Sequence, residues 1–580
     1  MTKHKKNIKR QHFLQLVLVI IIIVIINVIS DSIFTRFDLT NEKRYTLSDA
    51  TKKTLKNLDD IVYFKVYLDG EFPAGFKRLR RETKELLDEF RAFNKNIEYE
   101  FINPSISESE QERNFTYQLL VEQGLTPTSL QVKTKNGLEQ QVIFPGMIVA
   151  YREKELPVEL LDAQINVPPE AVLNNSIQNL EFKFVNAIHL LTRSLKPRIA
   201  FIKGHGEVDE MDAYDLNLTL KQDYIVDRVK IDEQINALVK RILVDSAMNK
   251  YELSPRYDAI VIAKPDSVFS SKDKFIIDQY IMHGGKVLWL IDQVLTSMDS
   301  IQSQESTVAV SNNLNLDDLI FKYGVRMNYN LVMDLNAMPI AIRTGQVGGQ
   351  PQLNFFPWYY FPVITPISQH PIVKNLNAIK TQFVGSIDTV RAPGIRKTVL
   401  LKTSPYSRTV NTPAVISLGI IRQQPDESLY RGPSKITAVL MEGEFESFYR
   451  NRIPPEIANA NEIGFSEYSK YTSMIFVSDG DMIRNQFRIP GGEPLPLGYD
   501  QYTRETFGNK DFILNAINYL VEGPELINLR TRELSLRLLD QTRVNNNKLQ
   551  WQLINLLLPI LLIALLGSIL VWLRKQKYSR

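Results

Sequence analysis

The chain has 580 residues, of which 44% are hydrophobic and 23% charged, and its formal net charge at pH 7 is +4. This length exceeds what one hydrophobic core supports and predicts more than one domain. The absence of cysteine excludes disulfides, thiolate nucleophiles and cysteine-ligated zinc.

An apolar segment near the N-terminus predicts a first transmembrane helix over residues 13–30. It follows a tail, residues 1–12, that carries five lysines and arginines. A segment of this length can cross the roughly 30 Å hydrocarbon core as a helix. A cleaved signal peptide also has a basic start and an apolar middle, but residues 30–37 lack the small-residue cleavage pattern. This favours an uncleaved anchor.

Residues 31–195 are predicted to form an N-terminal extracytoplasmic α/β domain. Ser48 is a good N-cap for a helix that continues to Leu58, because its hydroxyl can accept from a free amide of the first turn. Two strands flank a charged amphipathic helix, and a hairpin, a further strand of the same sheet and a closing helix follow. In chain order these elements are expected over residues 61–68, 78–94, 97–102, 130–144, 147–151 and 177–192.

Residues 196–540 are predicted to form a doubly wound α/β domain with insertions. Short apolar strands alternate with helices, which is typical of a mainly parallel sheet covered on both faces. The strands are expected at 199–202, 224–230, 257–263, 286–291 and 474–477, and the helices at 212–221, 271–283 and 509–520. A mobile Ser/Gln-rich loop is expected over 296–313, and irregular structure with short strands over 338–404.

A second transmembrane helix is predicted over residues 552–573, ahead of the basic tail 574–580. A buried core helix is the alternative, but the segment is apolar on all faces and has Trp572 near its exit. Basic residues beside a span stay on the cytoplasmic side, so both tails are expected in the cytoplasm. The tails hold nine basic residues, which leaves −5 for the rest of the chain. An ectodomain with this charge lacks the basic field of a nucleic-acid-binding protein.

The best candidate for a ligand site lies where predicted strands end. One imidazole and several carboxylates follow such strands, and open α/β sheets place their ligands at this edge. A small molecule or a cation would bind there. The structural interpretation, in which glycines form tight turns and carboxylates cap helices, is the favoured one. The candidate residues are Gly204, His205, Gly206, Glu207, Asp292, Asp479 and Asp481.

A dense aromatic cluster over residues 355–362 has two interpretations of about equal weight. Aromatic side chains dominate interface hot spots, which predicts a partner-docking surface. The same residues could instead fill the core of their own domain. The candidate docking residues are Phe355, Phe356, Trp358, Tyr359 and Tyr360.

Motifs for familiar chemistry are missing from the sequence. There is no G-x-x-x-x-G-K-[ST] phosphate loop, no H-E-x-x-H zinc motif and no G-x-S-x-G nucleophile elbow. We therefore expect no ATP hydrolysis by this chain, no catalytic residue, no metal site and no cofactor.

Several short segments resemble the GldG family, the auxiliary component of the gliding-motility ABC transporter of Bacteroidetes. The resemblance lies in residues 36–40, 43–48, 204–207, 356–360, 370–374 and 386–389, and the paired anchors fit it. It implies a separate ABC ATPase, a separate multi-span permease and an inner-membrane location with the large domain in the periplasm. The second domain also resembles the glutamine-amidotransferase-type fold, which is used elsewhere as a non-catalytic interaction module. The absence of a nucleophilic cysteine supports such a non-catalytic use.

Three functions are compared on this basis. The leading hypothesis is a non-catalytic accessory component of an ABC transporter that supports gliding. The second is a membrane-tethered solute or glycan receptor with its site at residues 204–207 and the aromatic cluster. The third is a metal-dependent hydrolase that would use His205, Glu207 and Asp292.

Overall fold

A computed structural model of the chain describes residues 16–19, 22, 46–134, 137–162, 164, 167–193, 195–245, 250–347, 350–489, 491–527, 529 and 547–578. The chain divides into two units: Leu47–Arg532 is one, and the terminal segments Met1–Thr46 and Glu533–Arg580 are the other. The predicted first transmembrane helix, residues 13–30, lies outside the described residues except for 16–19 and 22.

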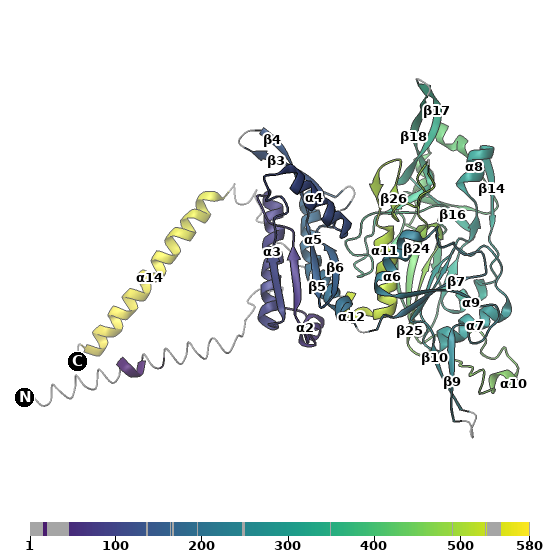
Figure 1. Cartoon of the computed structure of the whole chain (residues 1–580), viewed down its shortest axis with the longest axis horizontal. Helices are drawn as coiled ribbons and strands as arrows, with labels where there is room; N and C mark the ends of the chain where they lie inside the picture. The colour runs from purple at the N-terminus through teal and green to yellow at the C-terminus, as the bar shows by residue number, and fades with distance from the viewer. Residues whose placement is uncertain are drawn as a thin grey trace, which may run out of the picture. The chain divides into compact units, whose positions relative to one another are not determined.

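Helix α14 (Lys548–Tyr578) dominates the described part of the terminal unit (Figure 1). Its stretch Lys548–Gln576 meets the length and composition of a membrane span, and no part of the stretch is buried within the chain. At 1.5 Å per residue the helix is roughly 46 Å long, which exceeds the hydrocarbon thickness of a bilayer. The predicted second span, residues 552–573, lies within this exposed apolar helix.

The smaller sheet of the main unit has the strand order β2-β1-β5-β6. Helices α3 and α5 pack beside each other, and their apolar faces share one core with β1 and β5 (Figure 1). Ser48 Oγ accepts from the Thr51 amide at 3.0 Å, which confirms the predicted N-cap of α2. The elements are α2 (Asp49–Lys56), β1 (Val62–Val66), α3 (Ala74–Phe93), β2 (Ile97–Phe101), α4 (Glu110–Glu122), β5 (Gly146–Tyr151), β6 (Lys154–Glu159) and α5 (Pro169–Thr192).

The predicted hairpin is present as β3 (Thr128–Thr134) and β4 (Gly137–Ile143). It forms a separate two-stranded sheet, whereas β5 pairs with β1 and β6. The expectation that the strand at 147–151 continues the hairpin's sheet is therefore wrong. Local alternation identifies a strand but not its neighbour.

The larger sheet contains nine strands. Its parallel half has the order β8-β7-β11-β12-β25. The other half is antiparallel, because β24 pairs antiparallel with β25, and β20, β21 and β15 extend the sheet in the same way. The strands are β7 (Arg198–Lys203), β8 (Ile225–Lys230), β11 (Ala259–Ala263), β12 (Val287–Leu290), β15 (Val325–Met327), β20 (Ile387–Thr389), β21 (Arg396–Lys402), β24 (Ile436–Gly443) and β25 (Thr472–Val477).

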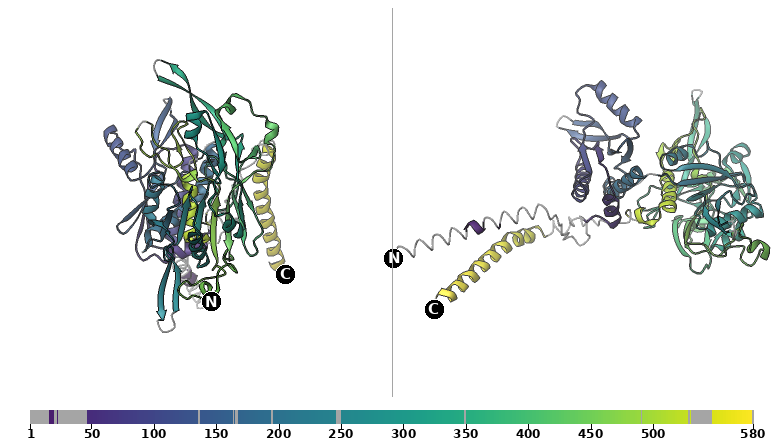
Figure 2. Two further views of the ribbon diagram at one scale, coloured as in Figure 1. Left: turned by 90° about the vertical axis from the view of Figure 1, so that its right-hand side faces the viewer. Right: turned by 60° about the horizontal axis from the view of Figure 1, so that its bottom comes forward.

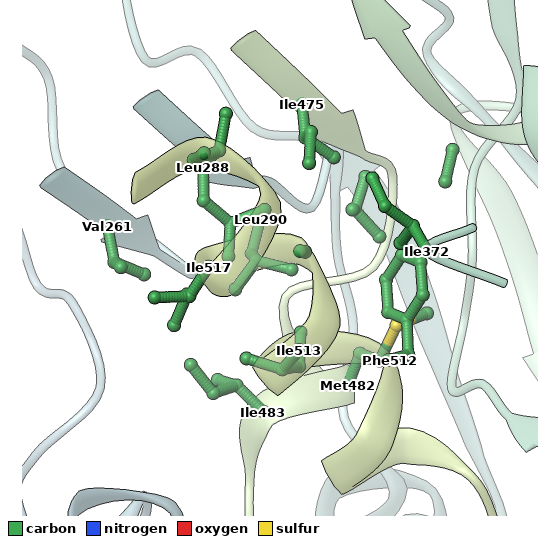
Figure 3. Packing of buried hydrophobic residues seen from close by; sticks show 14 of the residues in the cluster. Val261, Leu288, Leu290, Ile372, Ile475, Met482, Ile483, Phe512, Ile513 and Ile517 are labelled. Atoms are coloured by element: carbon green, nitrogen blue, oxygen red, sulfur yellow. The ribbon is translucent and has the colours of Figure 1, made fainter. Parts of the chain in front are cut away.

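Both faces of β7, β11, β12 and β25 are buried, as the sequence predicts, whereas β8 is only partly buried. In β11, Val261 points into one core while Ile260 and Ile262 belong to the core on the opposite face. Figure 3 shows the first core, where Ile513 and Ile517 lie against the sheet residues Val261, Leu288 and Leu290. The covering helices are α6 (Tyr214–Asp223) and α11 (Asn509–Glu522) on this face, and α7 (Ser271–Met282) and α9 (Asp317–Lys322) on the other.

The two predicted insertions are more ordered than the sequence suggested. The expected loop over 296–313 contains α8 (Met298–Gln304) and β14 (Ser306–Ser311). The expected irregular stretch contains the long strands β17 (Ala337–Val347) and β18 (Gln350–Ile364), which form a hairpin. Prolines are tolerated there because the hairpin has register shifts, one of them between Ala337 and Pro339.

Hairpin β17–β18 and hairpin β9–β10 extend from opposite ends of the larger α/β body (Figure 1 and Figure 2). The remaining elements are β9 (Val239–Asp245), β10 (Lys250–Pro255), β13 (Val294–Leu295), β16 (Asn330–Asp334), β19 (Ile379–Lys380), β22 (Ser407–Asn411), β23 (Ala414–Ser417), η1 (Leu418–Arg422), η2 (Glu427–Tyr430), α10 (Pro455–Ala458), η3 (Asp481–Ile483), β26 (Tyr499–Asp500), β27 (Glu505–Thr506) and α12 (Pro524–Ile527).

The described residues thus form a mixed α/β structure, and they include a candidate membrane helix at the C-terminus. The domain boundary at 195/196 and the likeness to amidotransferases stay predictions. Both sheets lie within the unit Leu47–Arg532, where Arg193 after α5 forms an ion pair with Glu522 of α11.

Candidate functional site

The predicted site residues follow strands that end at one edge of the larger sheet. Because β7, β11, β12 and β25 are parallel, their carboxyl ends share this edge. The order β8-β7-β11-β12-β25 reverses direction between β7 and β11, and such a switch point is where open α/β sheets form ligand crevices. His205 follows β7 and Lys264 follows β11, so these two residues flank the switch point.

His205 is the centre of a first buried cluster. Its Nδ1 lies 3.3 Å from Glu207 Oε1, and its Nε2 lies 3.0 Å from Asp273 Oδ2 in the first turn of α7. The ring also stacks on Phe269, with 3.7 Å between centroids. Burial lowers the pKa of His205, but the two carboxylates raise it by more, so the net pKa lies above its usual value. The cluster therefore ties the turn after β7 to α7 by charge-assisted hydrogen bonds.

The neighbouring glycines serve the turn itself. Gly206 has φ +76°, and a Cβ atom there would lie 1.6 Å from Asp266 Oδ1. The backbone carbonyl of His205 accepts from the Asp266 amide at 3.0 Å, so the turn packs directly on the loop after β11. A side chain at position 206 would separate these two segments.

Lys264 is the centre of a second cluster, formed by the ends of β11, β12 and β25. Its Nζ lies 2.9 Å from Asp292 Oδ2 and also forms an ion pair with Asp481. Asp292 Oδ1 accepts from the Gly480 amide at 2.5 Å. Asp479 is fully buried and accepts from the backbone amides of Gln382, at 2.9 Å, and Asp481, at 2.8 Å. Every one of these carboxylates thus has a partner within the protein.

The negative charge of the second cluster is offset in part by Lys264 and Arg484. Burial raises the pKa of Asp292 and of Asp479. Burial lowers the pKa of Lys264, but Asp292 and Asp481 raise it by more, so the ammonium stays charged at neutral pH. Among the described residues, no group of three or more His, Asp or Glu side chains is arranged to hold a metal ion.

The structure thus divides the predicted site residues between two clusters. Gly204, His205, Gly206 and Glu207 belong to the first, whereas Asp292, Asp479 and Asp481 belong to the second. The hydrolase hypothesis needs His205 and Glu207 to share a metal site with Asp292, and the described residues form no such site. A ligand-binding role for these residues stays a prediction.

Sequence reasoning missed Lys264 and Asp273, which complete the two clusters. Lys264 could have been found, because it is the first residue after an apolar strand. The other candidate residues also lie within a few positions of the end of a predicted strand. Asp273 has no such signal, because an acidic residue in the first turn of a helix normally interacts with the helix dipole.

The aromatic cluster lies on β18 and is divided between core and surface. Trp358 and Tyr360 are buried in the core beneath the hairpin, together with Phe361. Phe355 is 50% exposed, and Phe356 and Tyr359 are half-buried. For Trp358 and Tyr360 the core interpretation holds, because both side chains belong to the buried cluster beneath the hairpin. A docking role is left to Phe355, Phe356 and Tyr359.

Comparison with known families gives two matches. A family model described as an ABC-type uncharacterized transport system matches residues 196–516, more than half of the chain. A model described as a domain of unknown function matches residues 41–150.

Individual proteins show weaker similarity. An uncharacterized protein of Borreliella burgdorferi is 21% identical over 577 residues, which cover 98% of each chain. The solved structure of the mmIFT52 N-terminal domain matches 56% of this chain and 97% of its own, with 11% identity and a TM-score of 0.30.

Proposed function

The chain belongs to the family of ABC-type uncharacterized transport systems, and from this membership we propose that it is a non-catalytic, membrane-anchored accessory component of an ABC transporter. The family match over residues 196–516 is the observation that carries the proposal. A separate ATPase and a separate multi-span permease would be its partners, as the GldG resemblance implies. Support of gliding motility is the finer part of the proposal and rests on that resemblance alone.

The proposed location is the inner membrane, with both tails cytoplasmic and the large domain periplasmic. The exposed apolar helix over Lys548–Gln576 and the basic residues after it support this topology. Absence of cysteine suits an oxidising compartment such as the periplasm.

The chemistry of the sheet edge supports a non-catalytic role. Both ring nitrogens of His205 face carboxylates of the chain, and Lys264 forms ion pairs with Asp292 and Asp481. A general acid or base must instead reach the proton of a substrate. These groups contribute to stability by joining the ends of four strands.

The test is purification from native membranes through a C-terminal tag in a gentle detergent, followed by mass spectrometry. We expect a stoichiometric ATPase and a multi-span permease. A matched variant in which residues 548–576 are replaced by an unrelated apolar span keeps the anchor but removes its specific side chains. Loss of the permease from this variant alone would assign the contact to the C-terminal helix, and retention would assign it to the large domain or to the predicted first span. A chain that purifies without both partners contradicts the proposal.

A further inference from the structure

A cavity of about 620 Å³ lies beside α9 and β15. Its walls also include the first residue of β16 and the last residue of β22, where Asn330 pairs with Asn411. Ligand pockets in proteins commonly have volumes of roughly 300–1,000 Å³. The cavity is therefore large enough for a small organic ligand.

Part of the cavity wall is held by internal contacts. The hydroxyl of Tyr329 donates to Asp317 Oδ2 at 2.5 Å, and Asp318 forms an ion pair with Lys274 at 2.5 Å. Asn328 Nδ2 donates to Asp388 Oδ2 at 2.9 Å. These bonds fix the orientation of the polar wall before any ligand arrives, which reduces the entropy lost on binding.

Other groups of the wall are left for a ligand. Within the part of the chain that the structure describes, the side chains of Arg326 and Asn411 have no hydrogen-bond or ion-pair partner. Phe321 lines the same cavity and is 53% exposed, although it is a large apolar side chain on the short helix α9. An unpaired guanidinium, an unpaired carboxamide and an exposed aromatic face thus converge on one concavity.

The charges of the wall discriminate among classes of ligand. Among the described residues, Asp317 carries a negative charge that only a neutral hydroxyl accompanies, which disfavours an anion, and the free Arg326 disfavours a cation. Carboxamide, carboxylate and guanidinium groups together offer both donors and acceptors, and each hydroxyl group of a ligand can both donate and accept. The exposed ring of Phe321 offers apolar area to carbon-bound hydrogens.

We propose that this cavity binds a neutral polyhydroxylated ligand, namely a saccharide unit of a glycan. Arg326 and Asn411 hydrogen-bond its hydroxyl groups, and Phe321 packs against the C–H face of its ring. The inference concerns the large domain alone and does not depend on the transporter partners proposed above.

The test is direct binding to the full chain in lipid nanodiscs, since maltoside detergents would themselves present sugars. Saturation-transfer NMR and calorimetry would use maltohexaose, cellohexaose, chitohexaose and laminarihexaose as probes. We expect saturable binding of at least one probe. Arg326→Ala and Phe321→Ala should each raise its Kd by about tenfold, the loss expected for one good polar or apolar contact. Asn411→Trp should abolish binding by filling the cavity.

Two exposed residues elsewhere supply matched controls. Arg431→Ala and Phe115→Ala change the same residue types at exposed positions and should leave the Kd unchanged. Thermal unfolding of each variant checks that it is folded. The proposal is overturned if no probe binds wild-type protein saturably or if binding survives all three cavity variants. It is equally overturned if a neutral Ser/Gly-rich peptide binds in place of the sugars and responds to the same variants.

Discussion

At the scale of single residues, His205 makes stability depend on pH. Its folded pKa lies above the ordinary value of 6.5, so its contribution is fully present below pH 6.5 and is lost as the pH rises through the folded pKa. We expect His205→Phe, which keeps the stacking on Phe269, to lower Tm most at pH 5.5–6.5 and progressively less toward pH 8.5.

His283 provides a control of opposite sign. Burial lowers its pKa, so its contribution falls as the pH drops through 6.5. The Tm difference between wild type and His283→Phe should therefore grow with rising pH. Equal slopes for the two variants would contradict the assignment of charge to His205.

Lys264 allows a second test at this scale. Lys264→Met leaves Asp292 without its cation and leaves Asp481 with Arg484 alone, and it should lower the free energy of unfolding by about 2–4 kcal/mol. This loss is smaller than the roughly 3–5 kcal/mol for a fully buried pair, because 26% of the Lys264 side chain is exposed. In Lys264→Met/Asp292→Asn the loss should be smaller than the sum of the single losses by about 1 kcal/mol or more, measured by chemical denaturation. Additive losses would mean that the pair is not coupled.

At the scale of elements, the single strand β18 contains both buried core residues and exposed surface residues. Trp358→Ala should cost about 3–5 kcal/mol, because the side chain is fully buried under the hairpin. Phe355→Ala should change stability by no more than about 0.5 kcal/mol. If Phe355 docks a partner, the same variant will lose co-purifying protein at unchanged Tm. Retention of the partner would limit β18 to a structural role.

In the larger sheet, local sequence predicts some strands but not how they pair. The run Ala259–Ala263 is apolar throughout, so a strand buried on both faces was predictable from its residues. The antiparallel pairing of β24 with β25 was not predictable from local residues. It depends on which edge of the sheet is free when the chain returns from a long insertion. Strand β18 was missed because its prolines indicate irregular structure, whereas the register shifts of the hairpin accommodate them.

At the scale of the whole molecule, the cysteine-free chain permits a direct test of topology. Single cysteines introduced as Ser303→Cys in α8 and Ser579→Cys in the C-terminal tail would each be the only thiol. In spheroplasts, a membrane-impermeant maleimide should label position 303 at once and position 579 only after the membrane is permeabilised. Labelling of position 579 in intact spheroplasts would overturn the cytoplasmic placement of the tail.

The features that sequence alone determined are those encoded by neighbouring residues. The apolar helix at the C-terminus, the cap at Ser48 and the strands of the parallel half follow from local composition and period. The pairing of charges depended on folding: Lys264 and Asp481 are 217 positions apart, and nothing local links them. The same holds for Asp273 beside His205 and for the cavity beside α9. Side chains acquire such partners only when the sheet brings the ends of distant strands to one edge, because contact chemistry depends on distance in space and not on distance along the chain.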